Sequence, residues 1–192
     1  MKFPKLSNSI RKIGRSHTGR IALVAIPTGV VSAILMGGVA QGAVPVSFAV
    51  SGTQFQITSS QLEGTGFSQY SGYAKDAEGG KHSVVTANIK DATLENLCQS
   101  AVADPPMGKV GVVIKAGGRG TPAAAKDLQI GMTGLRGDAE FKNIRIGVDA
   151  SDVNTAEKGT KGDFAQDADT ISIKKLEQDS WSTTASVFTL KD

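Results

Sequence analysis

The chain has 192 residues, of which 21 are Lys or Arg and 18 are Asp or Glu, for a formal net charge of +3. Six of the basic residues and none of the acidic ones precede position 43, so the remainder carries 15 basic against 18 acidic residues. Nucleic-acid binding needs a clustered basic surface, so this mildly acidic part speaks against nucleic acid as a partner. The single cysteine, Cys98, excludes a disulfide within the chain.

The N-terminal part combines a basic region with a long apolar stretch. Residues 1–20 hold all six basic residues of this part, and the uncharged stretch that follows runs from Ile21 to Ala40. At about 1.5 Å per residue, a helix of this length crosses a hydrocarbon core of ~30 Å. Because basic flanks stay in the cytoplasm, we expect a cytoplasmic region at 1–20, a transmembrane or signal helix at 21–42 in the lipid bilayer, and an extracytoplasmic domain at 43–192.

Cleavage of this segment remains open. Ala40 and Gly42 place small residues at the −3 and −1 positions of a cut before Ala43, as signal peptidase requires. The apolar run is longer than the ~7–15 residues of an ordinary signal-peptide core, which favours a retained anchor. The two alternatives predict a secreted protein and a protein of the cell membrane, respectively.

Small residues recur every four positions within the apolar segment, at Ala25, Gly29, Ala33 and Gly37. On a helix these positions lie on nearly one face, where small side chains allow another membrane helix to approach closely. The stripe predicts packing against a second copy or a membrane-protein partner. The alternative is that signal sequences are simply rich in Ala and Gly.

The part from Ala43 to Asp192 is of ordinary single-domain size. Its apolar residues alternate with polar ones in short runs bounded by Gly, Asp, Asn, Pro or Ser, which predicts many short strands and an all-β domain. The runs include 48–50, 55–57, 110–114, 128–132, 144–148, 171–173 and 188–190.

A weak internal repeat accompanies these strands. Its apolar positions are spaced by two and then by three residues, which fits a strand, a bend at an Asn or Gly, and a second strand with the same inward face. The copies are Ala92-Leu94-Leu97, Ile130-Met132-Leu135, Ala139-Phe141-Ile144 and Ile171-Ile173-Leu176. Such coils build a β-solenoid, but their uneven spacing fits a twisted β-sandwich equally well, and both architectures stay open.

Polar or glycine-rich stretches at 67–80, 103–106 and 151–166 are expected to be loops, and Gly117 to Gly120 a turn between strands rather than an anion-binding nest. Trp181 is expected in the core or on a binding face, and Cys98 in the interior.

No catalytic, cofactor or metal site is predicted. The string Gly66-Phe67-Ser68-Gln69-Tyr70 lacks the closing glycine of a nucleophile elbow, and His82 is the only histidine after the N-terminal segment. No His or Cys pair has the spacing of zinc ligands. The acidic groups at 149–152 and 163–169 lack the regular pattern of a calcium loop and are expected to be solvated turns.

Three blocks carry a family resemblance. They are the apolar segment with Ala40-Gln41-Gly42-Ala43 and 47–52, the string Asn96-Leu97-Cys98-Gln99-Ser100, and the strings 138–144 and 181–185. In these blocks the chain resembles an uncharacterised exported-protein family of high-GC Gram-positive bacteria, sometimes labelled cholesterol esterase in genome annotation. The resemblance implies export and brings no catalytic residues with it.

Three functional hypotheses follow. The first is a non-enzymatic cell-envelope protein, in which the N-terminal helix tethers or exports a β-domain that packs against itself or a membrane partner. The second is a carrier of an apolar, lipid-like ligand, which predicts a cavity lined by apolar side chains, whereas a scaffold predicts a filled core. The third is an esterase, which the missing elbow disfavours.

Overall fold

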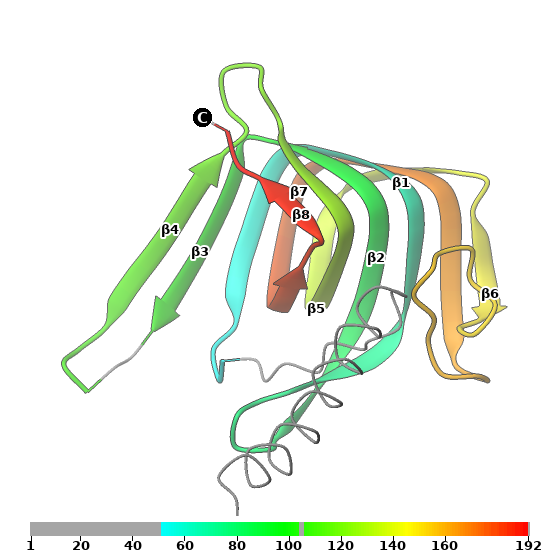
Figure 1. Cartoon of the computed structure of the whole chain (residues 1–192), viewed down its shortest axis with the longest axis horizontal. Helices are drawn as coiled ribbons and strands as arrows, with labels where there is room; N and C mark the ends of the chain where they lie inside the picture. Colours follow the sequence, from blue (N-terminus) through cyan, green and yellow to red (C-terminus); the bar gives the residue numbers. More distant parts are fainter. Residues whose placement is uncertain (1–50, 104–105, 192) are drawn as a thin grey trace, which may run out of the picture. The chain divides into compact units, whose positions relative to one another are not determined.

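The computed structural model describes residues 51–103 and 106–191 (Figure 1). The expected helix at 21–42, its stripe Ala25, Gly29, Ala33 and Gly37, and the cleavage positions Ala40 and Gly42 lie outside the described residues. Within these two ranges, no helix has the length and apolar character needed to cross a membrane.

The described part is an eight-stranded antiparallel sheet, which confirms the all-β expectation. The strands are β1 (Phe55–Lys75), β2 (Lys81–Glu95), β3 (Leu97–Ala103), β4 (Val110–Ala116), β5 (Ala123–Lys142), β6 (Arg145–Asp149), β7 (Phe164–Thr184) and β8 (Val187–Thr189). Their order is β4-β3-β1-β2-β5-β7-β6, and β8 pairs with β5.

The sheet bends around its own core, because β1 pairs with both β2 and β7. Since β2 also pairs with β5 and β5 with β7, the pairings lead back to β1. Figure 1 shows these four strands as long, strongly curved ribbons, with the β3–β4 hairpin projecting to one side. The arrangement is consistent with a β-sandwich. The solenoid alternative was wrong, because all pairings between the described strands are antiparallel, whereas solenoid coils stack parallel strands.

Sharp bends in the strands occur at residues with a left-handed backbone. Asn96 (φ 50°), Asn143 (φ 54°) and Lys175 (φ 53°) lie directly before the third apolar position of three repeat copies. A left-handed residue shifts the alternation by one position, so the same face can stay inward beyond the bend. Leu97 and Leu176 are buried beyond their bends, whereas Ile144 is 37% exposed. The repeat therefore marks bends in an antiparallel sheet, as its spacing of two and then three indicated.

The two asparagine bends are tied to neighbouring strands by their side chains. Asn96 Nδ2 donates to Ser60 Oγ at 2.9 Å, and Asn143 Nδ2 donates to Asp169 Oδ2 at 2.7 Å. Asn tolerates the left-handed region better than most residues, and its short amide can bond locally. These bends separate β2 from β3 and β5 from β6.

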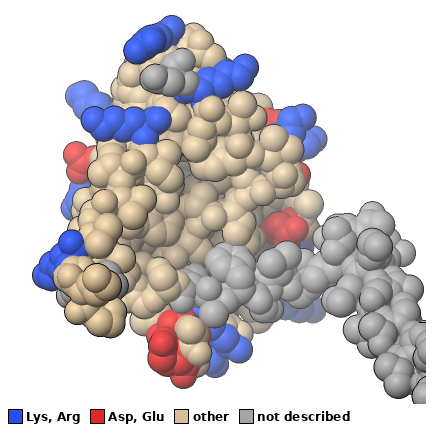
Figure 2. Space-filling model, turned by 60° about the vertical axis from the view of Figure 1, so that its left-hand side comes forward, with Lys and Arg blue, Asp and Glu red and all other residues tan. Residues whose placement is uncertain are grey.

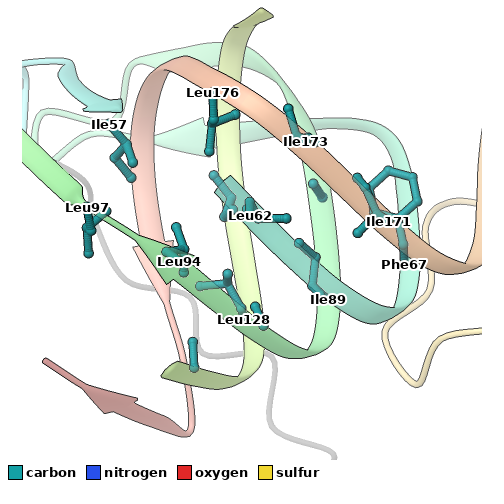
Figure 3. Packing of buried hydrophobic residues seen from close by; sticks show 14 of the residues in the cluster. Ile57, Leu62, Phe67, Ile89, Leu94, Leu97, Leu128, Ile171, Ile173 and Leu176 are labelled. Atoms are coloured by element: carbon teal, nitrogen blue, oxygen red, sulfur yellow. The ribbon is translucent and has the colours of Figure 1, made fainter. Parts of the chain in front are cut away.

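The main core lies between the curved strands. Figure 3 shows Leu62, Ile89, Ile171 and Ile173 pointing toward one another from β1, β2 and β7. The backbone of β1 approaches closely at Gly64, where an added Cβ would lie 2.5 Å from Ile89 Cγ2. Small residues thus let the sheet close tightly in a chain with few aromatic side chains.

The expected loops are partly corrected. The stretch 67–80 is mostly strand, because β1 continues to Lys75 and only Asp76 to Gly80 form the turn to β2. The stretch that begins at Ser151 is a loop that ends where β7 starts at Phe164, and Gly117 to Gly120 lie between β4 and β5, as expected.

Candidate functional site

A pocket of about 380 Å³ opens at the surface between the β3–β4 hairpin and the C-terminal end of β7. Its walls are Ser51, Phe55, Leu97, Gln99, Ile114, Trp181, Ser182, Thr183, Thr184, Ala185, Phe188 and Leu190. None of these side chains is charged, and half of them are large apolar or aromatic groups. The pocket therefore suits an apolar ligand better than an ionic one.

The strand order places these walls around the start of β1. Phe55 is the first residue of β1 and pairs with Ala101 of β3 on one side and with Ser180 of β7 on the other. Strands β3 and β7 consequently flank Phe55 on its two sides. Residues distant in sequence, such as Leu97 of β3 and Trp181 of β7, come together because the first residues of β1 pair with both of these strands.

Apolar side chains continue outward from the pocket along the hairpin. Gln99 and Ile114 are cross-strand partners that both line the pocket, and the next pairs on the same face are Ala101 with Val112 and Ala103 with Val110. Val110 and Val112 are about half exposed. Figure 2 shows a hollowed, mostly uncharged surface with both basic and acidic side chains at its margins.

Trp181 links the pocket to the β1–β2 turn. Its indole stacks on the His82 imidazole, with ring centroids 3.8 Å apart and planes inclined by 19°. Ala74 and Val84 pack against the same indole. The only tryptophan of the chain therefore lines the pocket and also packs against buried side chains. It thus has features of both expected positions, the core and a binding face.

His82 is in turn held by Asp76. His82 Nε2 lies 3.0 Å from Asp76 Oδ2, and the Gly80 amide donates to Asp76 Oδ1 at 2.6 Å. The bond from His82 is the main reason why the pKa of Asp76 lies below its ordinary value, and the Gly80 amide acts in the same direction. The arrangement closes the turn and orients the imidazole against Trp181, a structural role.

Thr183 contributes an unsatisfied polar atom to the pocket wall that also holds Trp181. Its Oγ1 is buried and has no hydrogen-bond partner among the described residues. Buried polar atoms are nearly always paired, so a hydroxyl in this state is an exception that calls for a reason.

A second polar cluster fastens the loop between β6 and β7. Arg145 binds the Asp167 carboxylate through two bonds, from Nε at 2.9 Å and from Nη2 at 2.6 Å. The backbone N–H of Asn154 donates to the same carboxylate at 2.6 Å. The bonds from Arg145, followed by that from Asn154, lower the pKa of Asp167 although its burial opposes this.

The acidic residues Asp149, Asp167 and Asp169 therefore accept hydrogen bonds that stabilise loops and strand ends. Asp167 is buried, which corrects the expectation of a solvated turn. Asp149 accepts bonds from the amides of Ser151 and Gly162, and Asp169 accepts one from Asn143. Across residues 51–103 and 106–191, no group of three or more His, Cys, Asp or Glu side chains is placed to hold a metal ion.

The remaining residues singled out in the sequence are also placed. Cys98 carries a free thiol that is half-buried on β3, rather than interior as expected. Phe188 and Leu190 line the pocket, whereas their alternation in the sequence predicted only a strand. Alternation shows that one face is apolar, but it does not indicate that this face borders a pocket instead of the core.

Comparison with known proteins gives a family and no closer relative. Neither the curated proteins nor the solved structures contain a significant match to the chain. A model described as a family of unknown function, DUF6230, matches residues 51–192, which include every described strand. With most of its length covered by this match, the chain belongs to the DUF6230 family.

Proposed function

We propose that the protein is a non-enzymatic cell-envelope protein whose β-domain binds an apolar, lipid-like ligand in the pocket between β3 and β7. The uncharged pocket of about 380 Å³ is the observation that carries this proposal. Placement in the envelope rests on the basic region at 1–20 and the apolar segment at 21–42, whether that segment anchors the domain or is cleaved.

The chemistry of the walls supports an apolar ligand of modest size. Small-molecule pockets commonly span ~300–1,000 Å³ and combine apolar walls with a few polar groups. Here Phe55, Leu97 and Trp181 supply apolar contact, while Gln99 and Thr183 are polar. A single acyl chain with an uncharged or weakly polar end fits this composition, and a highly charged ligand would lose its hydration without a partner.

Quenching of Trp181 fluorescence by an uncharged brominated lipid, methyl 9,10-dibromostearate, tests the proposal. Because Trp181 is the only tryptophan and lines the pocket, its quenching reports occupancy of this place. We expect saturable quenching of the full chain, kept in solution by an amphipathic polymer. Phe188→Asp should weaken binding at least tenfold, because it sets a carboxylate on the pocket wall.

Val187→Asp is the matched control for this experiment. Val187 is the neighbour of Phe188 in β8, is exposed, and is not among the pocket walls. Quenching that is linear and unsaturable, or equally affected by the two aspartates, would contradict binding in the pocket.

A second candidate is an assembly subunit, in which the β-domain packs against another protein. The specific observation in its favour is the apolar hairpin that projects beside the pocket, with exposed valines at Val102, Val110, Val112 and Val113. Esterase activity comes third, because the string Gly66-Phe67-Ser68-Gln69-Tyr70 lacks the closing glycine of a nucleophile elbow.

A further inference from the structure

Strand β4 ends the sheet and presents apolar side chains on both of its faces. It pairs with β3 on one side and has no second strand partner within 51–103 and 106–191. Val110 is 51%, Val112 50% and Val113 59% exposed, and Ile114 is 38% exposed. Lys115 is its only charged residue.

Such an edge is unusual for a protein that remains alone. An unpaired edge strand offers a row of backbone donors and acceptors to any other strand, and natural proteins usually protect edges with charges, prolines or bulges. β4 has seven residues, contains no proline, and has a regular register with β3 from Val110 to Ala116. A strand of this kind is suited to pairing with another strand.

We propose that β4 pairs antiparallel with β4 of a second copy, so that two β-domains form one continuous sheet across a two-fold axis. This dimer goes beyond the proposed ligand binding and does not depend on it. Its symmetry is closed, because each copy offers the same edge to the other, and cyclic dimers of this kind are the commonest soluble oligomers.

The sequence of β4 selects one register for this pairing. A two-fold axis through Val113 overlaps the whole strand and places Val112 opposite the partner's Ile114 and Val110 opposite the partner's Ala116. Lys115 then lies opposite the partner's Gly111, where no side chain competes with it. An axis through Val112 would instead set Lys115 against the partner's Lys109, and opposed like charges are destabilising.

The same register gives the dimer one apolar face on the pocket side. Ile114 lines the pocket, and Val112 and Val110 follow on its face by the two-residue alternation of a strand. Cross-strand pairs of β-branched residues stabilise a sheet, so burial of these half-exposed side chains favours the paired state.

Disulfide trapping tests the register directly. In the full chain with Cys98→Ser, we expect Val113→Cys to give a covalent dimer under mild oxidation. Residues opposed in antiparallel strands have Cα atoms roughly 4.5–5.5 Å apart, within the range that a disulfide spans. Val110→Cys is the matched control, because its copy would lie six positions away along the strand, about 20 Å.

A charge substitution provides the second arm. Val113→Lys opposes two ammonium groups at the axis and should raise the dimer dissociation constant at least tenfold, measured by native mass spectrometry. Ile146→Lys, on β6 at the opposite end of the strand order and 66% exposed, should leave the dimer intact. Circular dichroism confirms that both variants fold.

Three outcomes would overturn the proposal. A monomeric full chain would do so, whether another molecule covers β4 or nothing does. Equal cross-linking of the cysteines at 113 and 110 would show random collision in place of a defined register. A dimer that survives Val113→Lys and does not cross-link at 113 would place the interface elsewhere, for instance in the N-terminal segment.

Discussion

At the scale of single residues, the best-defined interaction is the buried carboxylate of Asp167. Its side chain is 1% exposed and that of Arg145 is 48% exposed. The carboxylate accepts both guanidinium bonds and the Asn154 amide, which joins β6 and β7 to the loop between them. A buried charge needs such partners, because without them burial is strongly unfavourable.

We predict that Asp167→Asn lowers the free energy of unfolding by about 2–3 kcal/mol at pH 7, because it removes charge-assisted hydrogen bonds from a buried group. Asp169→Asn, which alters an exposed carboxylate two positions away, should cost less than ~1 kcal/mol. Urea denaturation followed by circular dichroism measures both. Equal losses in the two variants would mean that the Asp167–Arg145 pair contributes nothing specific.

The same residue predicts part of the pH dependence. The folded-state pKa of Asp167 is lowered, so its contribution is fully present above the ordinary Asp value of ~3.9 and is lost as pH falls through the lower folded value. The wild-type chain should therefore lose more stability than Asp167→Asn below about pH 4. Parallel acid titrations would contradict this assignment.

At the scale of strands, the sharp bends decide the shape of the sheet. Gly66, Asn96, Asp127, Asn143 and Lys175 all have φ between 47° and 63° and each precedes an apolar residue. Without these bends, strands of about 20 residues would run straight and could not keep one face on the core. Lys175 is the least expected of the five, because a long side chain gains nothing from a left-handed backbone.

We expect Lys175→Val to lower the free energy of unfolding by about 1–2 kcal/mol, because a β-branched side chain clashes with its own backbone at φ 53°. Lys174→Val is the matched control, since this neighbour is also exposed but has an ordinary strand backbone. Valine suits a strand, so the control should stay within about 0.5 kcal/mol of wild type. A comparable loss in both would contradict the bend as the cause.

At the scale of the whole molecule, the described strands surround one main core. All buried members of that core lie between Ile57 and Leu176. The family match begins at Ser51 and covers the same stretch. A domain of this size can bury enough apolar surface to be stable without disulfides.

We therefore predict that residues 51–192 produced alone fold to an all-β domain with a single cooperative thermal transition. Far-ultraviolet circular dichroism and calorimetry measure this, with the full chain as reference. A fragment that binds a hydrophobic dye and melts without cooperativity would show that residues before Ser51 complete the core.

The sequence predicted the all-β class of the fold but not the pocket. Strand alternation and the spacing of Ala92, Leu94 and Leu97 indicated an all-β chain with bends, because these signals are local. The same pattern did not distinguish coils of a solenoid from an antiparallel sheet. That choice depends on which strands pair, and local alternation is the same in both.

What the sequence by itself determined is the all-β class, several strands such as those within β4, β5 and β7, and the absence of a recognisable catalytic motif. Its alternating runs did not include β2 or β3, and it predicted a loop at 67–80, most of which belongs to β1. The tertiary structure alone decided that β1 begins between β3 and β7, with Phe55 paired to both strands. It also decided that β4 remains at the edge and that Asp167 is buried against Arg145. The physical reason is that backbone conformation follows from neighbours along the chain, whereas pockets and edges follow from contacts between residues far apart in sequence.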